Sequence, residues 1–180
     1  GRILSRPRRS MTHKLFHDDP AMRRFSATVL ERSDDGRRLV LDGTAFYATS
    51  GGQPHDTGVL LPSENGGSAA RVVDVVEEPA GGEDEVRIVH HLDTALDVAP
   101  GDPVEGRVDG GRRDDFSRQH TGQHLLSALF ADRHGLNTVS VHFGEDHSTL
   151  DLDAPAVSRE VLQEMEDAAN ALVAENRRVV

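Results

Sequence analysis

Residues 118–128 read RQHTGQHLLSA and carry the clearest pattern in the chain. Five residues in and around this stretch are spaced as the residues on one face of a helix are, at intervals of three and four: Phe116, His120, Gln123, His124 and Ser127. This period predicts a helix that begins after Gly110-Gly111 and stops at Gly135. On one face of such a helix His120 and His124 lie about 6 Å apart at Cβ, as two ligands of one metal ion would. Zinc usually takes four ligands, so the alternative, one core and one solvated histidine, stays open.

The residues after this helix predict a hairpin and a second helix. The hairpin strands are expected at 138–143 and 149–152, joined by a polar turn at 144–147. The second helix opens near Ser158, and its apolar stripe has a period of 3.6 residues. A helix, a hairpin and a helix leave a sheet that needs further strands, which Val179-Val180 could begin. We therefore expect the chain to be truncated at its C-terminus.

The N-terminal half is expected to be a small antiparallel β-barrel. Short strands are predicted at 25–30, 39–41, 72–76, 86–92 and 104–108. Turn residues separate them: Asp34-Asp35-Gly36, Asn65-Gly66-Gly67, Gly81-Gly82 and Pro100-Gly101-Asp102. The predicted fold class is α+β, with an N-terminal segment at 1–19, the barrel at 20–110 and the first part of an α+β domain at 111–180.

Composition restricts the class of protein. The formal net charge is -11, which argues against a broad basic surface for nucleic acid, so any RNA contact must be local. The chain has no cysteine, which excludes disulfides and thiolate ligands within it and fits a reducing cytoplasm. No apolar run approaches the length of a membrane span. Residues 1–10 lack the features of a secretory signal, so Met11 is a plausible start.

A glycine-dense loop at 50–58 reads SGGQPHDTG. Adjacent glycines allow a backbone to approach a ligand closely and to present N–H groups to an anion or a terminal ribose. The loop lacks the Gly-Lys-Ser/Thr ending of a nucleotide-hydrolase phosphate loop. A tight barrel turn is the alternative interpretation.

Two further groups could serve a substrate. Ser140 and His142 are two residues apart and therefore lie on the same face of the predicted strand. They could bind a small polar molecule if that face turned toward the histidine pair. Arg112, Arg113 and Arg118 lie beside the pair in sequence and could dock a phosphate backbone. The alternatives are an exposed polar hairpin and arginines paired with neighbouring aspartates.

Taken together, these stretches resemble the alanyl-tRNA editing proteins of the AlaX type and the editing domain of alanyl-tRNA synthetase. The resemblance rests on three motifs in order, FYATSGGQPHDTG at 46–58, RQHTGQHLLSA at 118–128 and VHFG at 141–144. In addition, KLF at 14–16 followed by Asp19-Pro20 resembles the opening of the longer freestanding members. The resemblance covers the chain from about Met11 to its end.

The resemblance implies a barrel related to those of translation factors, followed by an editing domain shared with threonyl-tRNA synthetase. It implies that His120 and His124 bind Zn2+ together with a Cys and a further His from a later segment, which this sequence lacks. The predicted catalytic or substrate-side residues are Thr121, Gln123, Ser140 and His142. The predicted tRNA contacts are Gly51, Gly52, Gln53, Asp56, Arg112, Arg113 and Arg118.

The reaction implied is hydrolysis of the ester that joins serine, or glycine, to the terminal ribose of alanine tRNA. A synthetase pocket cannot strongly reject an isostere that only adds a hydroxyl, which is why a second hydrolytic site is needed. The chain as given is expected to be inactive without its remaining ligands. The alternatives are a non-catalytic tRNA-binding module and a fragment of a full alanyl-tRNA synthetase. A peptidase of the His-Glu-x-x-His type is disfavoured because Thr121 stands where its Glu would be.

Overall fold

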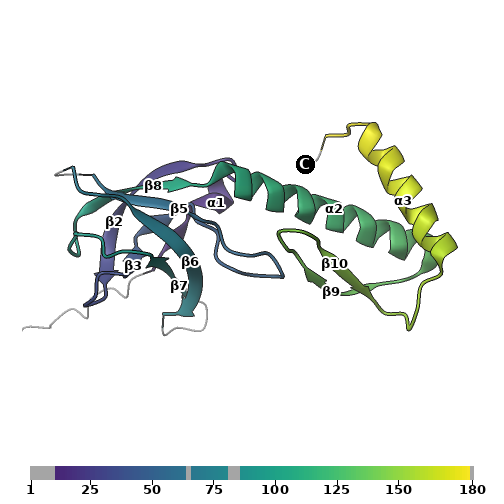
Figure 1. The fold of residues 1–180 in the computed structure, drawn as a ribbon, viewed down its shortest axis with the longest axis horizontal. Helices are drawn as coiled ribbons and strands as arrows, with labels where there is room; N and C mark the ends of the chain where they lie inside the picture. The colour runs from purple at the N-terminus through teal and green to yellow at the C-terminus, as the bar shows by residue number, and fades with distance from the viewer. Residues whose placement is uncertain (1–10, 64–65, 81–85, 179–180) are drawn as a thin grey trace, which may run out of the picture. The chain divides into compact units, whose positions relative to one another are not determined.

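The computed structural model describes residues 11–63, 66–80 and 86–178. The chain divides into two compact units, and most of their elements are labelled in Figure 1. The first unit consists of Gly1–Ser50 and Pro54–Arg113, and the second of Gly51–Gln53 and Asp114–Val180. The three-residue segment Gly51–Gln53 therefore belongs to the second unit, although residues of the first unit flank it in sequence.

Six strands of the first unit form one antiparallel sheet that closes into a barrel. They are β2 (Arg24–Arg32), β3 (Arg38–Leu41), β5 (Gly58–Pro62), β6 (Ala70–Pro79), β7 (Val86–Leu92) and β8 (Pro103–Val108). Neighbours pair in the order β2-β3-β7-β6-β5-β8, and β8 pairs again with β2. Two short strands, β1 (His13–Lys14) and β4 (Gly43–Thr44), pair in parallel, and helix α1 (Leu15–Asp18) follows β1 directly.

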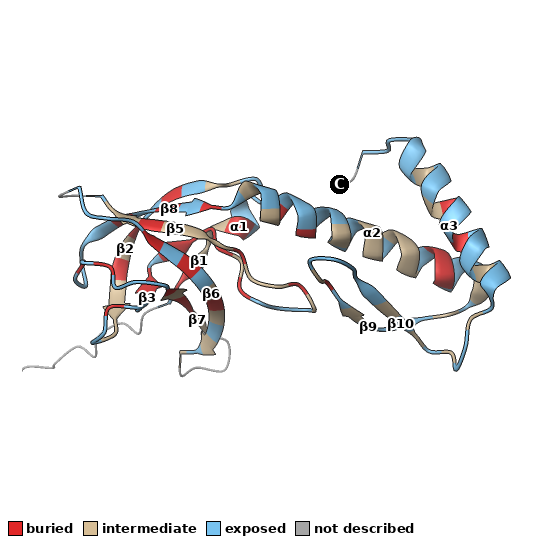
Figure 2. Ribbon diagram, viewed as in Figure 1, coloured by how far each residue is buried: buried red, intermediate tan, exposed pale blue. Residues whose placement is uncertain are grey.

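The barrel forms because apolar side chains from all six of its strands share one core. In β8, Val104, Gly106 and Val108 are buried, whereas the residues between them are exposed. Gly106 lies opposite Phe25 in the neighbouring strand, and the Phe25 ring occupies the space that a side chain at position 106 would need. Buried residues follow the barrel strands in Figure 2; they alternate in β8 and in the first part of β2, whereas β3 and β7 each bury three consecutive residues.

The second unit consists of two helices and a hairpin. Helix α2 (Gly110–His134) has its first four residues in the first unit and continues through the second. Strands β9 (Thr138–His142) and β10 (Thr149–Leu152) pair antiparallel, and helix α3 (Arg159–Ala174) follows. Ser158 caps α3, since its hydroxyl accepts the backbone N–H of Val161 at 3.3 Å.

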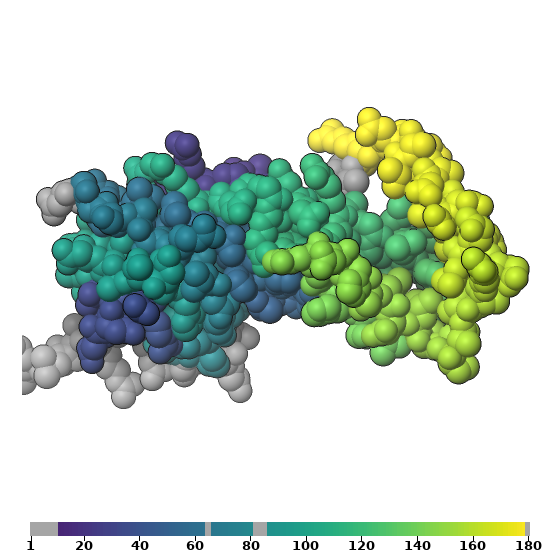
Figure 3. Space-filling model, in the orientation of Figure 1, coloured from purple at the N-terminus to yellow at the C-terminus, as the bar shows by residue number. Residues whose placement is uncertain are grey.

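A small apolar core joins the two helices of this unit. Its buried residues are Leu129, Phe130, Met165 and Ala168. Leu162 and Val173 of α3 remain 49% and 66% exposed, and Figure 3 shows much of the α3 surface, in yellow, open to solvent. The apolar stripe of α3 is thus only partly covered.

The structure bears out the predicted order of elements and differs at particular places. The first helix, the hairpin and the second helix all form; α2 begins at Gly110, where the prediction had it begin after Gly111, and Gly135 ends it with a φ of 65°. Strand β5 was not predicted, because the run GVLLP shows no alternation and ends in proline. Three predicted features, the turns at Asn65 and Gly81-Gly82 and the strand at Val179-Val180, lie outside the described residues. The domain limits and the relation to translation-factor barrels stay predictions.

In the described part of the chain, no helix is long and apolar enough to span a membrane.

Candidate functional site

His120 and His124 project from successive turns of α2 and bring two imidazole nitrogens together. Their Nε2 atoms lie 3.0 Å apart, and the rings stack with centroids at 4.8 Å and an interplanar angle of 25°. Two nitrogens bound tetrahedrally to one zinc ion at about 2.0 to 2.1 Å would lie about 3.3 Å from each other. The pair therefore fits as two ligands of a single zinc ion.

The surroundings of His120 favour its neutral form. Partial burial lowers the pKa of His120, and the nearby charge of His124 lowers it further. A metal binds neutral imidazole, so a lowered pKa reduces the competition from protons. The ring of Phe143 provides part of this apolar surrounding, with its centroid 5.8 Å from that of His120.

The residues that the structure describes do not form a complete metal site. Within residues 11–63, 66–80 and 86–178, no three His, Cys, Asp or Glu side chains come together as a metal site would require. His120 and His124 would supply two of the four ligands that zinc usually takes.

The four predicted catalytic or substrate-side residues lie in the second unit but differ in how their side chains are engaged. The Thr121 hydroxyl donates to the carbonyl of Ser117 at 3.0 Å, within the helix. The Gln123 amide donates to Ser127 at 2.8 Å, and Ser127 bonds to Thr138 of β9 at 2.6 Å. These bonds tie β9 to α2.

The hairpin places its residues differently from the sequence-based expectation. Ser140 donates its hydroxyl to Asp151, its partner on β10. His142 is exposed, and it is Phe143, the next residue, that packs against His120. Thus the hairpin residue in ring contact with the histidine pair is apolar, which the pattern of polar residues did not reveal.

The glycine-dense loop meets the end of β9 within the second unit. The backbone N–H of Phe143 donates to the carbonyl of Gly52 at 3.2 Å. Gly51 and Gly52 both have positive φ, 57° and 82°, and a Cβ at Gly52 would overlap the carbonyl oxygen of Val141. Gln53 is only 7% exposed. The close backbone approach expected from the two glycines is therefore an approach to β9.

Two predicted tRNA contacts, Asp56 and Arg113, form a buried ion pair in the first unit. Asp56 is 2% exposed and Arg113 5%. The Nε of Arg113 lies 3.0 Å from both carboxylate oxygens of Asp56, and its other nitrogens donate to the carbonyls of Ala45 at 2.6 Å and Pro20 at 3.2 Å. Asp56 also accepts the backbone N–H of Tyr47 at 2.7 Å. This arrangement gives both residues a structural role and leaves their charges inaccessible to a phosphate.

The other two arginines predicted to contact tRNA, Arg112 and Arg118, are more exposed to solvent than Arg113. The Nε of Arg112 donates to the carbonyl of His55 at 3.1 Å, and Arg112 is partly exposed. Arg118 is exposed on α2, two residues before His120. Their contact with tRNA stays a prediction.

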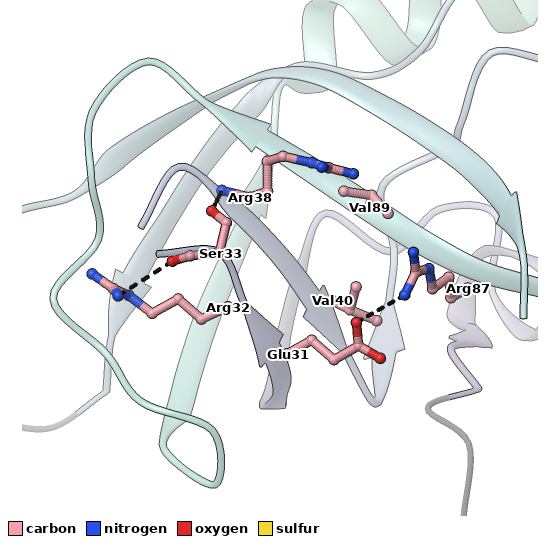
Figure 4. A pocket seen from close by; sticks show the side chains of 7 residues that line it. All are labelled: Glu31, Arg32, Ser33, Arg38, Val40, Arg87 and Val89. Atoms are coloured by element: carbon pink, nitrogen blue, oxygen red, sulfur yellow. Dashed lines mark hydrogen bonds and ion pairs between the residues drawn. The ribbon is translucent and has the colours of Figure 1, made fainter. Parts of the chain in front are cut away.

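A hollow of about 160 Å³ lies on strands β2, β3 and β7 of the barrel, and its lining is shown in Figure 4. Three arginines line it, but Arg87 donates to Glu31 at 2.9 Å and to Glu78 at 2.7 Å, and Arg38 to Glu78 at 3.0 Å. The hydrogen bond from Arg87 holds the pKa of Glu78 below its ordinary value. The third arginine, Arg32, donates to the carbonyls of Leu96 at 3.4 Å and Ser33 at 3.3 Å. Because all three guanidinium groups already have partners, the hollow has the character of a surface polar network.

Comparisons with known proteins agree with the pattern of motifs. No family model matches the chain. It is 35% identical over 169 residues to the alanyl-tRNA editing protein AlaX-M of Methanosarcina acetivorans, covering 94% of this chain and 68% of that protein. The AlaX-M of Methanosarcina mazei is 35% identical over 170 residues, covering 94% of this chain and 66% of the relative.

A longer class of relative matches the same residues. The alanine–tRNA ligase of Methanosarcina barkeri is 37% identical over 174 residues, which are 94% of this chain but only 18% of the ligase. The chain thus spans about two thirds of the AlaX-M relatives and less than a fifth of the ligase. With this identity and coverage, the chain belongs to the family of alanyl-tRNA editing proteins represented by AlaX-M.

Proposed function

We propose that this chain is part of a zinc-dependent hydrolase that removes a wrongly attached amino acid, serine or glycine, from alanine tRNA. The names of the AlaX-M relatives support alanyl-tRNA editing as the activity. The observation that carries the proposal is the convergence of the His120 and His124 Nε2 atoms at 3.0 Å, in the stretch 118–128 on which the resemblance to this family rests. A zinc ion held there would polarise the ester carbonyl, activate a water molecule or hold the amino group of the substrate.

The residues of the chain would contribute binding and discrimination. Serine differs from alanine by one hydroxyl, and a polar group left unpaired when alanine binds would disfavour alanine. The side chains of Thr121, Gln123 and Ser140 each donate a hydrogen bond to a residue of the same unit. The His142 side chain has no such partner within the described residues, so we assign it to the substrate hydroxyl. The contacts to tRNA are proposed for Gly51, Gly52, Arg112 and Arg118, because Gln53, like Asp56 and Arg113, is buried.

The metal can be tested directly. Zinc content and release of serine from mischarged alanine tRNA are measured on the whole protein, on His120→Ala and His124→Ala, and on His147→Ala as a control at an exposed histidine of the same unit. We expect both ligand variants to lose the zinc and the activity and the control to keep them. Zinc content unchanged in the two ligand variants would contradict the proposal.

The assignment of His142 has its own test. His142→Ala is expected to slow serine release while tRNA binding and zinc content are kept. Serine release at the wild-type rate would remove His142 from the substrate site without affecting the zinc proposal.

The arginine contact is tested by salt dependence. Arg118→Gln is expected to weaken tRNA binding and to reduce the slope of log affinity against log salt by about 1. Arg159→Gln, an exposed arginine at the start of α3, is the matched control and is expected to bind as the wild type. Equal slopes in all three proteins would exclude Arg118 from the tRNA contact.

A second candidate function is a tRNA-binding module without catalysis. It is favoured by the finding that the described residues supply two ligands where zinc usually takes four. It predicts tRNA binding with neither zinc nor deacylation in the whole protein, so the same measurements separate the two functions.

A further inference from the structure

Gln119, the residue directly before His120, links helix α2 to the turn between β9 and β10. Its Oε1 accepts the hydroxyl of Ser148 at 2.6 Å. Its Nε2 donates to the backbone carbonyl of Gly144 at 3.2 Å and to the carboxylate of Asp115, one turn earlier in α2, at 2.9 Å. The side-chain amide of Gln119 therefore bonds to the hairpin turn through both its oxygen and its nitrogen. Its nitrogen also bonds to the helix that carries the histidines.

The two hairpin residues that Gln119 holds stand on either side of the turn. Gly144 directly follows Phe143, whose side chain is 2% exposed and whose ring lies against His120. Ser148 directly precedes Thr149, which pairs with His142 at the end of the hairpin. Fixing both ends of the turn therefore fixes where the Phe143 ring lies.

We propose that Gln119 is a positioning residue that holds the Phe143 ring against His120 and so fixes the orientation of this imidazole toward the metal. The metal part of this inference rests on the proposed function, whereas the placement of Phe143 does not. Partners outside the ligand shell commonly orient metal-binding histidines, and their loss typically weakens metal affinity 10- to 100-fold. Here the orientation is transmitted by ring packing, and Gln119 acts through the hairpin.

The placement is tested without metal. Gln119→Ala removes both kinds of hydrogen bond, whereas Gln119→Glu keeps an acceptor for Ser148 but loses the N–H that reaches the Gly144 carbonyl. We expect faster amide hydrogen exchange at residues 143–149, with a larger effect in Gln119→Ala than in Gln119→Glu. We also expect a shifted ring-proton resonance of His120 at fixed pH in Gln119→Ala, which adds no charge beside the imidazole. Gln163→Ala is the matched control, because Gln163 of α3 donates only within its own helix, to Asp167 at 3.1 Å.

The metal link is tested by titrating Zn2+ and Co2+ into the same proteins. Gln119→Ala is expected to raise the dissociation constant by about 10- to 100-fold, Ser148→Ala to raise it less, and Gln163→Ala to leave it unchanged. Unchanged hydrogen exchange and an unchanged His120 resonance in Gln119→Ala would overturn the positioning role. An altered hairpin with wild-type metal affinity would overturn its effect on the metal. A wild-type protein that binds no metal would overturn the proposed zinc function, while hydrogen exchange and the His120 resonance would still decide the role of Gln119.

Discussion

A single buried histidine gives the barrel a dependence on pH that is separate from the candidate metal site. His90 is fully buried, its Nε2 lies 2.8 Å from the Thr44 hydroxyl, and its Nδ1 lies 3.2 Å from the carbonyl of Leu39. The Thr44 hydroxyl oxygen also accepts the backbone N–H of Phe46 at 3.1 Å. A neutral ring that donates from Nδ1 and accepts at Nε2 satisfies all of these groups, and burial lowers the pKa of His90 to about 4.

We predict that the free energy of unfolding falls as the pH falls from 6.5 to 4 because of His90. In the unfolded chain a histidine takes up a proton near pH 6.5, whereas folded His90 does so only near pH 4. Within this window the unfolded state binds more protons, so acid favours unfolding, by roughly 3 kcal/mol in total. Urea unfolding across this pH range should show the slope, and His90→Gln should reduce it.

The carboxylates contribute to the same slope in both proteins, so the comparison isolates His90. A resonance of the His90 ring that titrates near pH 6.5 in the folded wild type would contradict the prediction even if His90→Gln fails to fold.

The pair of Asp56 and Arg113 is predicted to stabilise the first unit strongly while contributing little to ligand binding. Arg113→Met leaves the Asp56 carboxylate buried without its partner, and such a loss typically costs about 3 to 5 kcal/mol. Adding Asp56→Leu should recover part of this loss, because an apolar pair removes the unpaired charge. Recovery should be partial, since the N–H of Tyr47 then loses its acceptor.

Urea unfolding of the wild type, Arg113→Met and the double variant measures these differences. Arg113→Met as stable as the wild type, or a double variant less stable than Arg113→Met, would show that the ion pair is not the source of stability.

At the scale of elements, Gly51 and Gly52 offer a matched pair of substitutions in one loop. Both have positive φ, so an alanine strains the backbone at either position. Only at Gly52 would a Cβ overlap the carbonyl oxygen of Val141, because nothing lies within 4 Å of the position at Gly51. We predict that Gly52→Ala breaks the bond from Phe143 N–H to the Gly52 carbonyl and that Gly51→Ala keeps it.

Hydrogen exchange at the Phe143 amide measures this difference. It should accelerate in Gly52→Ala and stay near the wild-type rate in Gly51→Ala. Equal acceleration in both variants would mean that backbone strain, rather than the contact with Val141, determines how the loop meets β9.

The sequence predicts best those elements that depend on the spacing of residues close together in the chain. Helix α2 follows from spacings of three and four residues, and the convergence of His120 and His124 follows from the same geometry. Strands β2 and β8 follow from alternation and β3 and β7 from short apolar runs, whereas β5 shows no alternation because the residues on either side of buried Leu60 are all half-buried. Local pattern thus sufficed for the histidine pair and for most of the strands.

The rest of the candidate site depends on contacts between residues far apart in sequence. Asp56 and Arg113 are separated by 57 positions and Gln119 and Ser148 by 29, and no periodicity links either pair. The ring contact of Phe143 with His120 depends on where the hairpin turn lies, and the sequence pattern does not determine this position. For this reason the sequence named the polar neighbours, Ser140 and His142, and missed Gln119 and Phe143.

At the scale of the whole molecule, the two units differ in how much apolar surface each buries. The barrel core extends through all six strands of the sheet, whereas the buried core of the second unit consists of Leu129, Phe130, Met165 and Ala168. Stability rises with buried apolar area, so the second unit should open at a lower free energy than the barrel. Amide hydrogen exchange should show greater protection in β6 and β7 than in β9 and α3.

Zinc should stabilise the second unit and leave the stability of the barrel unchanged. A ligand that binds the folded state stabilises it by RT ln(1 + [L]/Kd), about 2.7 kcal/mol at a concentration of 100 Kd. Because His120 and His124 both belong to the second unit, we predict that added Zn2+ slows hydrogen exchange in α2 and β9 and leaves β6 and β7 unchanged. His124→Ala should abolish the effect. Equal slowing in both units would mean that the metal binds elsewhere or that the two units open together. If His124→Ala kept the slowing, the histidine pair would not account for zinc binding.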